Sequence, residues 1–389
     1  MSLTGRGTVI LMIALALGSI ALAGALWNCF PRPGWVRWPV RVSLVVVCQL
    51  TAVALAAVAL NDTDRFYNSW SELIGGHQGT MTATRPNRPS FADELRRQLA
   101  RQHHRGGSAM VSVQIPESGS ARTHTALVYL PAAYFTPFYE SRQFPVIELL
   151  DGYPGSPQTW AGPMHVQRTA DAEIVAGRAV PFIAVMAAQN FLPADRDGEC
   201  LDVPGGPQVE STLVHSVRET MLADFRVTAD RRSWAVMGYS TGGYCALKIA
   251  LRFPDQFASA VSILGNASPY QDSDTGLVFT RHPGLREDND PAWLVTHRTQ
   301  PDVALFLASS RGDPATRRAA QAFARLAHAP LRVESCSAAT GGHNFQTFRL
   351  YEPIGFDWLS GQLRAPLAPG ATVKTPAPHS SPSPSPPVR

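Results

Sequence analysis

Residues 234–242 read Trp-Ala-Val-Met-Gly-Tyr-Ser-Thr-Gly, and this stretch decides the fold. An apolar strand at Trp234–Met237 leads into Gly238-Tyr239-Ser240-Thr241-Gly242, and a helix is predicted over 242–252, before Pro254. A G-x-S-x-G motif between a strand and a helix is typical of a nucleophile elbow, whose strained turn exposes the serine above a sheet. The pattern therefore predicts Ser240 as a nucleophile, with a glycine-rich turn without chemistry as the alternative.

Strands and helices alternate on both sides of this motif. Two short apolar stretches, Met110–Ile115 and Thr125–Leu130, predict a leading hairpin. Further strands are predicted at Pro145–Leu150, Pro181–Ala187, Trp234–Met237, Ala260–Leu264, Val303–Ala308 and Leu331–Ser335, and helices at about 158–177, 211–225, 242–252, 315–328 and 345–362. This alternation predicts an α/β fold with a mostly parallel sheet covered by helices on both faces. Residues 266–300 have little periodicity and are expected to form a lid, a substrate-facing insertion or a plain surface loop.

A serine nucleophile needs a base, and His343 is the first candidate. It lies in Gly341-Gly342-His343-Asn344, directly after the last predicted strand, where two glycines free the backbone to aim the imidazole at the sheet edge. His297, in the irregular insertion, and His328, in a predicted helix, are the alternatives.

The acid of such a triad follows the serine and precedes the histidine in the chain. Between Val303 and Val333 the only acidic residue is Asp313, which would hold the tautomer of His343 and stabilise its imidazolium. The other interpretation is that Asp313 only caps the helix that begins at Pro314. Asp290, Asp302 and Glu334 are the remaining candidates for the acid.

An oxyanion hole requires two backbone N–H donors. The residue after the nucleophile, Thr241, supplies one. The second is expected from the glycine turn after Leu149-Leu150, in Asp151-Gly152-Tyr153-Pro154-Gly155. Pro154 has no N–H, so the donor is Tyr153 or Gly155, and Tyr153 is preferred.

The five cysteines form no CxxC or Cys/His ligand spacing, so no metal is expected. Cys200 lies in the long loop after the strand that ends near Ala187, and Cys245 lies in the first turn of the helix after Ser240. Both should reach the carboxyl edge of the sheet, whereas Cys336 follows a strand near the opposite side. The sequence therefore predicts a Cys200–Cys245 disulfide, with a free, packed Cys245 as the alternative.

Charged residues make up only 16% of the 389 residues, and the net charge of +4 is too small and scattered to indicate a nucleic-acid partner. The first sixty residues contain no Asp or Glu, and the apolar runs 8–27 and 42–60 have the length of membrane-spanning helices. Arg32, Arg37 and Arg41 lie between them, with Trp27, Trp35 and Trp38 as interfacial anchors. The positive-inside rule then predicts a transmembrane hairpin, residues 1–61, with both ends outside the cytoplasm.

The alternative for the first run is a signal peptide cleaved after Ala21-Leu22-Ala23. Cleavage there would place the three arginines outside and the rest of the chain in the cytoplasm, against the charge rule. The domains expected are therefore the hairpin, a linker at 62–107, a catalytic domain at 108–364 and a tail at 365–389. That tail holds eight prolines in 25 residues and is expected to be disordered.

Together, Leu149–Tyr153, Gly238–Gly242 and Gly341–His343 resemble the esterase D and mycolyltransferase-like branch of the α/β-hydrolases, over roughly 108–363. The run Gly-Tyr-Ser-Thr-Gly-Gly-Tyr-Cys-Ala is similar to membrane-anchored bacterial members. The resemblance implies the α/β-hydrolase fold, a Ser-Asp-His mechanism and acyl-ester chemistry without a cofactor. Mycolyltransferases take their acid as a Glu on the helix after the penultimate strand, but here the helix from Ala315 to His328 has no acid.

Three functions are consistent with these residues. The first is a membrane-anchored, extracytoplasmic serine esterase with Ser240, Asp313 and His343 as the triad and an acyl ester as substrate. The second is an acyltransferase that passes the acyl group to an envelope sugar or lipid. The third is an inactive hydrolase fold used as an interaction domain, which a missing triad member would have favoured.

Overall fold

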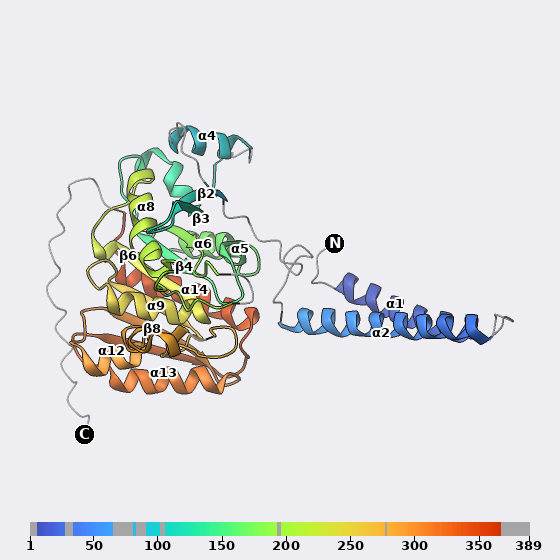
Figure 1. Cartoon of the computed structure of the whole chain (residues 1–389). Helices are drawn as coiled ribbons and strands as arrows, with labels where there is room; N and C mark the ends of the chain where they lie inside the picture. The colour runs from blue at the N-terminus through green and yellow to red at the C-terminus, as the bar shows by residue number, and fades with distance from the viewer. Residues whose placement is uncertain are drawn as a thin grey trace, which may run out of the picture.

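The computed structural model describes residues 6–27, 34–64, 81–82, 91–101, 106–192, 196–276 and 278–366. Its strands form one nine-stranded sheet in the order β1-β3-β5-β4-β6-β7-β8-β9, and β2 also pairs with β3 (Figure 1). The strands are β1 (Met81–Thr82), β2 (Ala109–Pro116), β3 (Arg122–Leu130), β4 (Val146–Leu150), β5 (Ile183–Ala187), β6 (Trp234–Tyr239), β7 (Ser259–Ile263), β8 (Ala304–Ser310) and β9 (Arg332–Ala338).

The helices connect and cover these strands. They are α1 (Arg6–Leu26), α2 (Gly34–Asp64), α4 (Phe91–Arg101), α5 (Pro157–Ala161), α6 (Val166–Val175), α7 (Val209–Ser211), the π-helical turn η3 (Thr212–Val217), α8 (Arg218–Asp224), α9 (Thr241–Arg252), α10 (Val278–Arg281), α11 (Pro283–Asp288), α12 (Pro291–His297), α13 (Pro314–Leu326) and α14 (Phe345–Gln362). Single 3-10 turns occur at η1 (Ala132–Phe135), η2 (Pro137–Tyr139) and η4 (Arg231–Ser233).

The predicted leading β-hairpin and the mostly parallel sheet are confirmed. Strands β2 and β3 pair antiparallel, β3 pairs antiparallel with β5, and β5, β4, β6, β7, β8 and β9 are parallel. The parallel strands β4, β5, β6, β7 and β8 are buried along their whole length. Burial on both faces is the reason that they appear in the sequence as continuous apolar runs rather than as alternating patterns.

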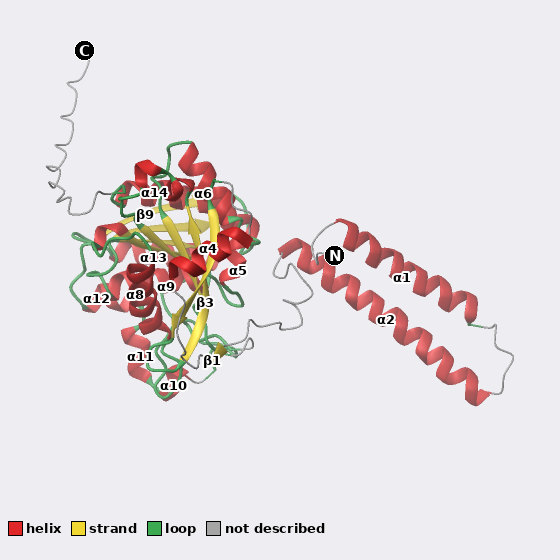
Figure 2. Ribbon diagram, turned by 90° about the horizontal axis from the view of Figure 1, so that it is seen from above, coloured by secondary structure: helices red, strands yellow, loops and turns green. Residues whose placement is uncertain are grey.

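Each face of the sheet carries its own hydrophobic core. Val146 and Leu150 of β4 point into a core that also contains residues of α8, α9 and α13, whereas Ile147 and Leu149 point into one with residues of α6 and α14. Figure 2 shows α6 and α14 on one side of the sheet and α8, α9 and α13 on the other. The architecture is therefore the three-layer α/β-hydrolase arrangement.

The strand order reverses next to β4, and this determines where the site forms. After β4 the chain moves to β5 on one side, and it then crosses back to β6 on the other side of β4. The carboxyl ends of β4 and β6 therefore form a topological switch point, which is the usual ligand position in open α/β sheets. Gly152 follows β4 and Ser240 follows β6 at this point.

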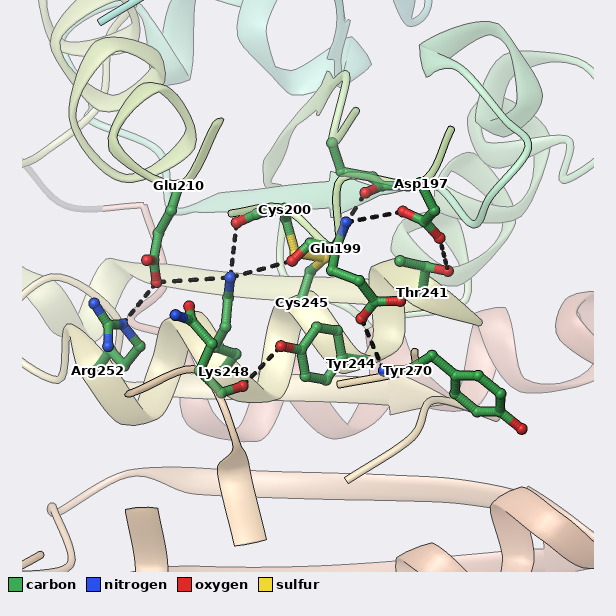
Figure 3. The surroundings of a disulfide bond; sticks show 12 residues. Asp197, Glu199, Cys200, Glu210, Thr241, Tyr244, Cys245, Lys248, Arg252 and Tyr270 are labelled. Carbon is green, nitrogen blue, oxygen red and sulfur yellow. Dashed lines mark hydrogen bonds and ion pairs between the residues drawn. A yellow bond between two sulfur atoms is a disulfide. The ribbon is translucent and has the colours of Figure 1, made fainter. Parts of the chain in front are cut away.

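The predicted Cys200–Cys245 disulfide is confirmed. The two Cα atoms lie 6.2 Å apart, and the bond joins the loop after β5 to α9 (Figure 3). Among the described cysteines, Cys48 and Cys336 are free, and Cys336 lies exposed on the edge strand β9.

The N-terminal segment contains two helices that pack side by side and antiparallel (Figure 2). The hydroxyls of Ser19 and Thr51 are 3.0 Å apart, and Arg41 donates to the carbonyl oxygen of Trp27 at the other end. Helix α2 begins at Gly34, well before the predicted residue 42, and runs through Pro39. One stretch, Trp38–Ala59, is long and apolar enough to cross a membrane, and Ile10–Leu26 is a shorter apolar helix.

Three parts of the chain differ from the predictions or lie partly outside the described residues. The helix predicted over 158–177 is broken into α5 and α6, because Gly162-Pro163 ends the first helix and His165 takes a left-handed φ of 59°. Residues 266–300 contain the three short helices α10, α11 and α12 rather than a loop. Arg32, most of the linker predicted at 62–107 and all but the start of the tail predicted at 365–389 lie outside the described residues.

Removing the disulfide by the double substitution Cys200→Ala/Cys245→Ala should lower the free energy of unfolding by about 4 kcal/mol. This is the chain-entropy value for a loop closed across 45 residues. Urea unfolding without reductant measures the change. The matched control Cys336→Ala removes an exposed, unbridged thiol and should leave the urea midpoint unchanged. Equal midpoints for the double variant and the control would show that the bridge does not stabilise the fold.

Candidate active site

Ser240 occupies a sharp turn between β6 and α9. Its φ of +55° and ψ of −126° lie outside the regions that non-glycine residues ordinarily adopt. The Ser240 N–H donates to the carbonyl oxygen of Ile263 at the end of β7, which anchors the turn. Such strain persists only where the surrounding structure enforces it, and it is a common feature of functional sites.

Close backbone contacts enforce this turn. A Cβ atom on Gly242 would lie 2.3 Å from the carbonyl oxygens of both Leu150 and Asp151, so the first turn of α9 rests directly on the end of β4. A Cβ atom on Gly152 would lie 2.9 Å from the Cβ of Ser240. The loop after β4 and the elbow therefore fit together only because these positions carry no side chain.

The structure brings Ser240, His343 and Asp313 into one hydrogen-bonded line. The Nε2 atom of His343 lies 2.8 Å from the Oγ of Ser240, and its Nδ1 lies 2.7 Å from the Oδ2 of Asp313. Both distances are those of good hydrogen bonds. The rings of His343 and Phe348 also pack edge to face, with centroids 5.1 Å apart, which limits rotation of the imidazole.

Asp313 is positioned for both of the roles considered for it. Its Oδ1 accepts from the backbone N–H of Thr316 and so caps α13, while its Oδ2 faces His343. Burial alone would raise the pKa of Asp313, but the hydrogen bonds from Thr316 and His343 outweigh it and lower that pKa below its usual value. The carboxyl group is therefore ionised at neutral pH and able to accept from an imidazole N–H.

Four of the five alternative candidates have other partners, and the fifth, Glu334, is exposed. Asp290 caps α12 through the N–H groups of Ala292 and Trp293, Asp302 pairs with Arg332, and Glu334 is exposed on β9. His297 stacks on Trp293, and His328 lies near the carbonyl oxygen of Ala329.

The two proposed oxyanion donors come from the segments that meet at Gly242. Thr241 is the first residue of α9, where backbone N–H groups have no partner within the helix and the helix dipole is positive. Tyr153 follows Gly152, the residue that abuts Ser240. Asp151, the first residue of this loop, is buried, and burial raises its pKa to about 7.

Sequence reasoning missed Asp197. Its Oδ2 lies 3.2 Å from the hydroxyl of Thr241, the residue next to Ser240. The loop that carries it has no periodicity or motif, so no local signal marked it. Burial, with Asp272 and Asp274 nearby, raises the pKa of Asp197 to about 6.

A pocket of about 410 Å³ lies between the segment 266–300 and α13. Its lining includes Asn266, Tyr270 and Arg286 on one side and Ala319 and Phe323 on the other. Within the ranges that the structure describes, no group of three or more His, Cys, Asp or Glu side chains is arranged to hold a metal ion.

Comparison with known proteins agrees with this architecture. The model of the Esterase family, whose description is "Putative esterase", matches residues 119–349, more than half of the chain. An uncharacterized protein of Corynebacterium glutamicum is 23% identical over 390 aligned residues, which cover 91% of this chain and 88% of that protein.

Solved structures with a similar fold include esterases and hydrolases. A ferulic acid esterase superposes with a TM-score of 0.55 at 21% identity, over 66% of this chain and 98% of that chain. An S-formylglutathione hydrolase from Agrobacterium tumefaciens has a TM-score of 0.56 at 15% identity, over 66% and 96%. The fluorophosphonate-binding serine hydrolase F of Staphylococcus aureus has a TM-score of 0.53 at 16% identity, over 66% and 99%.

The substitution Gly152→Ala should slow the reaction of Ser240 with a fluorophosphonate by about tenfold or more, because the new Cβ displaces the serine or the loop beside it. The rate of labelling and the thermal midpoint are measured together. Gly361→Ala, where a Cβ meets nothing within 4 Å, is the matched control and should label at the wild-type rate. Wild-type labelling of the Gly152 variant would refute the close packing described here.

Proposed function

The chain belongs to the Esterase family, an α/β-hydrolase type of enzyme, and from this premise we propose that it is a membrane-anchored serine esterase acting outside the cytoplasm. The observation that carries the proposal is the hydrogen-bonded line from Ser240 through His343 to Asp313. The substrate is a carboxylic ester, and envelope lipids or glycolipids are the esters that such an anchor would bring within reach.

In the proposed reaction, the Oγ of Ser240 attacks the ester carbonyl carbon while Nε2 of His343 takes its proton. Asp313 remains ionised, holds the Nδ1–H of His343 and stabilises the imidazolium. The negative oxygen of the tetrahedral intermediate is bound by the N–H groups of Tyr153 and Thr241.

Collapse of this intermediate breaks the bond to the alcohol, which leaves with the proton from His343 and yields an acyl-serine. Water then attacks the acyl-serine with His343 as base again. The acid departs, and Ser240 recovers its proton.

The anchor is the pair α1 and α2. The apolar side chains of both helices are largely exposed, for example Ile10, Leu17, Leu50 and Val53 at 60% or more. Helices that are apolar all round are stable in lipid rather than in water. Three arginines lie between the two apolar runs, so the charge rule puts that connection in the cytoplasm and the catalytic domain outside.

Acyl transfer is the second candidate, because the same acyl-serine can pass to an alcohol instead of water. It is favoured by the anchor, which would keep the acyl-serine beside lipid and sugar acceptors at the membrane surface. The ratio of free acid to new ester, measured as acceptor alcohol is added, distinguishes the two. The third possibility, an inactive interaction domain, is disfavoured by the complete Ser240–His343–Asp313 line.

The substitution Ser240→Ala should abolish hydrolysis of p-nitrophenyl butyrate and labelling by a fluorophosphonate, with an unchanged thermal midpoint. His343→Ala should be almost as damaging, because nucleophile and base act as a unit and losses of several powers of ten are usual. The full-length chain in detergent micelles is the sample. Full labelling of the Ser240→Ala protein would remove Ser240 from the mechanism.

Asp313→Ala should also lower kcat by orders of magnitude, since His343 would lose the acceptor of its Nδ1–H. Undiminished activity of this variant would exclude Asp313 as the acid. The remaining candidates for the acid would then be Asp290, Asp302 and Glu334.

Alkaline phosphatase, which is active only outside the cytoplasm, should be active when fused after Leu363 and inactive when inserted between Trp27 and Trp38. A cytoplasmic fluorescent reporter at the same two positions should give the reverse pattern. An active phosphatase in the hairpin connection and an inactive one after Leu363 would place the catalytic domain in the cytoplasm.

A further inference from the structure

The loop at 196–202 contacts one face of α9 at three successive positions along the helix. Asp197 contacts Thr241, Cys200 is bridged to Cys245, and Lys248 donates to the loop backbone (Figure 3). Positions 241, 245 and 248 are four and three residues apart, a spacing that aligns side chains on a single helix face. The loop therefore lies along the helix that begins directly after the nucleophile.

The conformation of this loop is held against its own backbone preference. Glu199 and Cys200 both have left-handed φ angles, of 48° and 44°. The amine of Lys248 donates to the carbonyl oxygens of these same residues, at 3.3 Å and 2.7 Å. Lys248 is completely buried and lies 3.9 Å from Glu210, which Arg252 also pairs. The buried amine of Lys248 and the disulfide thus hold Glu199 and Cys200 in unfavourable backbone conformations.

The consequence is that Asp197 is presented to Thr241 in one orientation. Its Oδ1 accepts from the N–H of Glu199 at 2.9 Å, and its Oδ2 faces the hydroxyl of Thr241 at 3.2 Å. Its backbone N–H donates to the carbonyl oxygen of Asp274, which ties the loop to the segment 266–300. Asp197 is only 6% exposed, so it is positioned by the protein rather than by solvent.

We propose that Asp197 is a positioning residue for the reaction: through the hydroxyl of Thr241 it holds the first turn of α9, and with it the Thr241 N–H, where the oxyanion forms. The inference rests on the proposed function, because it requires the Thr241 amide to be an oxyanion donor. Asp197 itself makes no contact with Ser240 or His343 in the described hydrogen bonds, and it acts only through its neighbour.

The chemistry of the contact predicts which substitution preserves it. An ionised carboxylate can only accept, so the Thr241 hydroxyl donates to it. In the Asp197→Asn variant the amide oxygen can still accept from the N–H of Glu199, while the amide NH₂ donates to the Thr241 hydroxyl. The contact survives with its direction reversed, whereas alanine removes both hydrogen bonds.

A double-mutant cycle on kcat for p-nitrophenyl butyrate tests the proposal. Asp197→Ala and Thr241→Val should each lower kcat about tenfold to hundredfold, with KM less affected, since outright loss of an oxyanion donor costs about 10²–10³. The double variant should be no slower than the slower single variant, because both changes break one interaction. Asp197→Asn should retain kcat within about threefold of wild type.

Several results would overturn the proposal. These are additive losses in the double variant, a wild-type kcat for Thr241→Val, or an Asp197→Asn protein as slow as Asp197→Ala. Rates are normalised to folded protein by circular dichroism, so that a merely structural role of Asp197 appears as a lower thermal midpoint with unchanged kcat. If Asp197→Ala fails to fold, the kcat values of Thr241→Val and Asp197→Asn test the proposal without it.

Two controls complete the design. Asp357→Ala, an exposed position on α14, is the matched aspartate substitution and should leave kcat unchanged. Ser240→Ala in the same assay distinguishes failure of the role proposed for Asp197 from failure of the proposed esterase function. If Ser240→Ala is inactive and Asp197→Ala has the wild-type kcat, only the role of Asp197 is refuted. If Ser240→Ala retains the wild-type kcat, the proposed function itself is refuted.

Discussion

The contact between the first turn of α9 and the end of β4 is the constraint on which the site depends. No side chain fits at Gly242, because a Cβ there would meet the carbonyl oxygens of Leu150 and Asp151 at 2.3 Å. This contact places Ser240 beside Gly152. It thereby brings the loop after β4 next to the start of α9, although the two are far apart in the sequence. The strand order places this contact at the switch point between β4 and β6, which is the usual ligand position in open α/β sheets.

Much of this arrangement is predictable from the sequence, because local signals and the global fold agree. Buried parallel strands are continuous apolar runs, and all of the predicted ones occur as strands. Parallel strands also end at the same edge, so residues that follow β6, β8 and β9 must gather there. This is why Ser240, Asp313 and His343 could be selected without coordinates, and the structure brings them within hydrogen-bond distance. Their catalytic roles stay predictions.

What the sequence did not reveal depends on tertiary contacts. The helices α10 and α11 are too short to generate a periodic pattern, and the break at Gly162-Pro163 was hidden by helix-compatible residues on both sides. The contact of Asp197 with Thr241 arises only when the loop folds back on α9. Similarly, the start of α2 before residue 42 contains Trp and Arg residues, which end the apolar run in the sequence but do not end the helix.

The burial of Lys248 has a practical consequence. The chain contains only two lysines, Lys248 and Lys374, and Lys248 is shielded completely under the disulfide-bonded loop. Acylation of Lys248 by an amine-reactive reagent therefore requires this loop to lift from α9, so the extent of Lys248 modification reports how often the loop opens beside Ser240. The molecule carries a built-in chemical reporter of local unfolding beside its candidate active site.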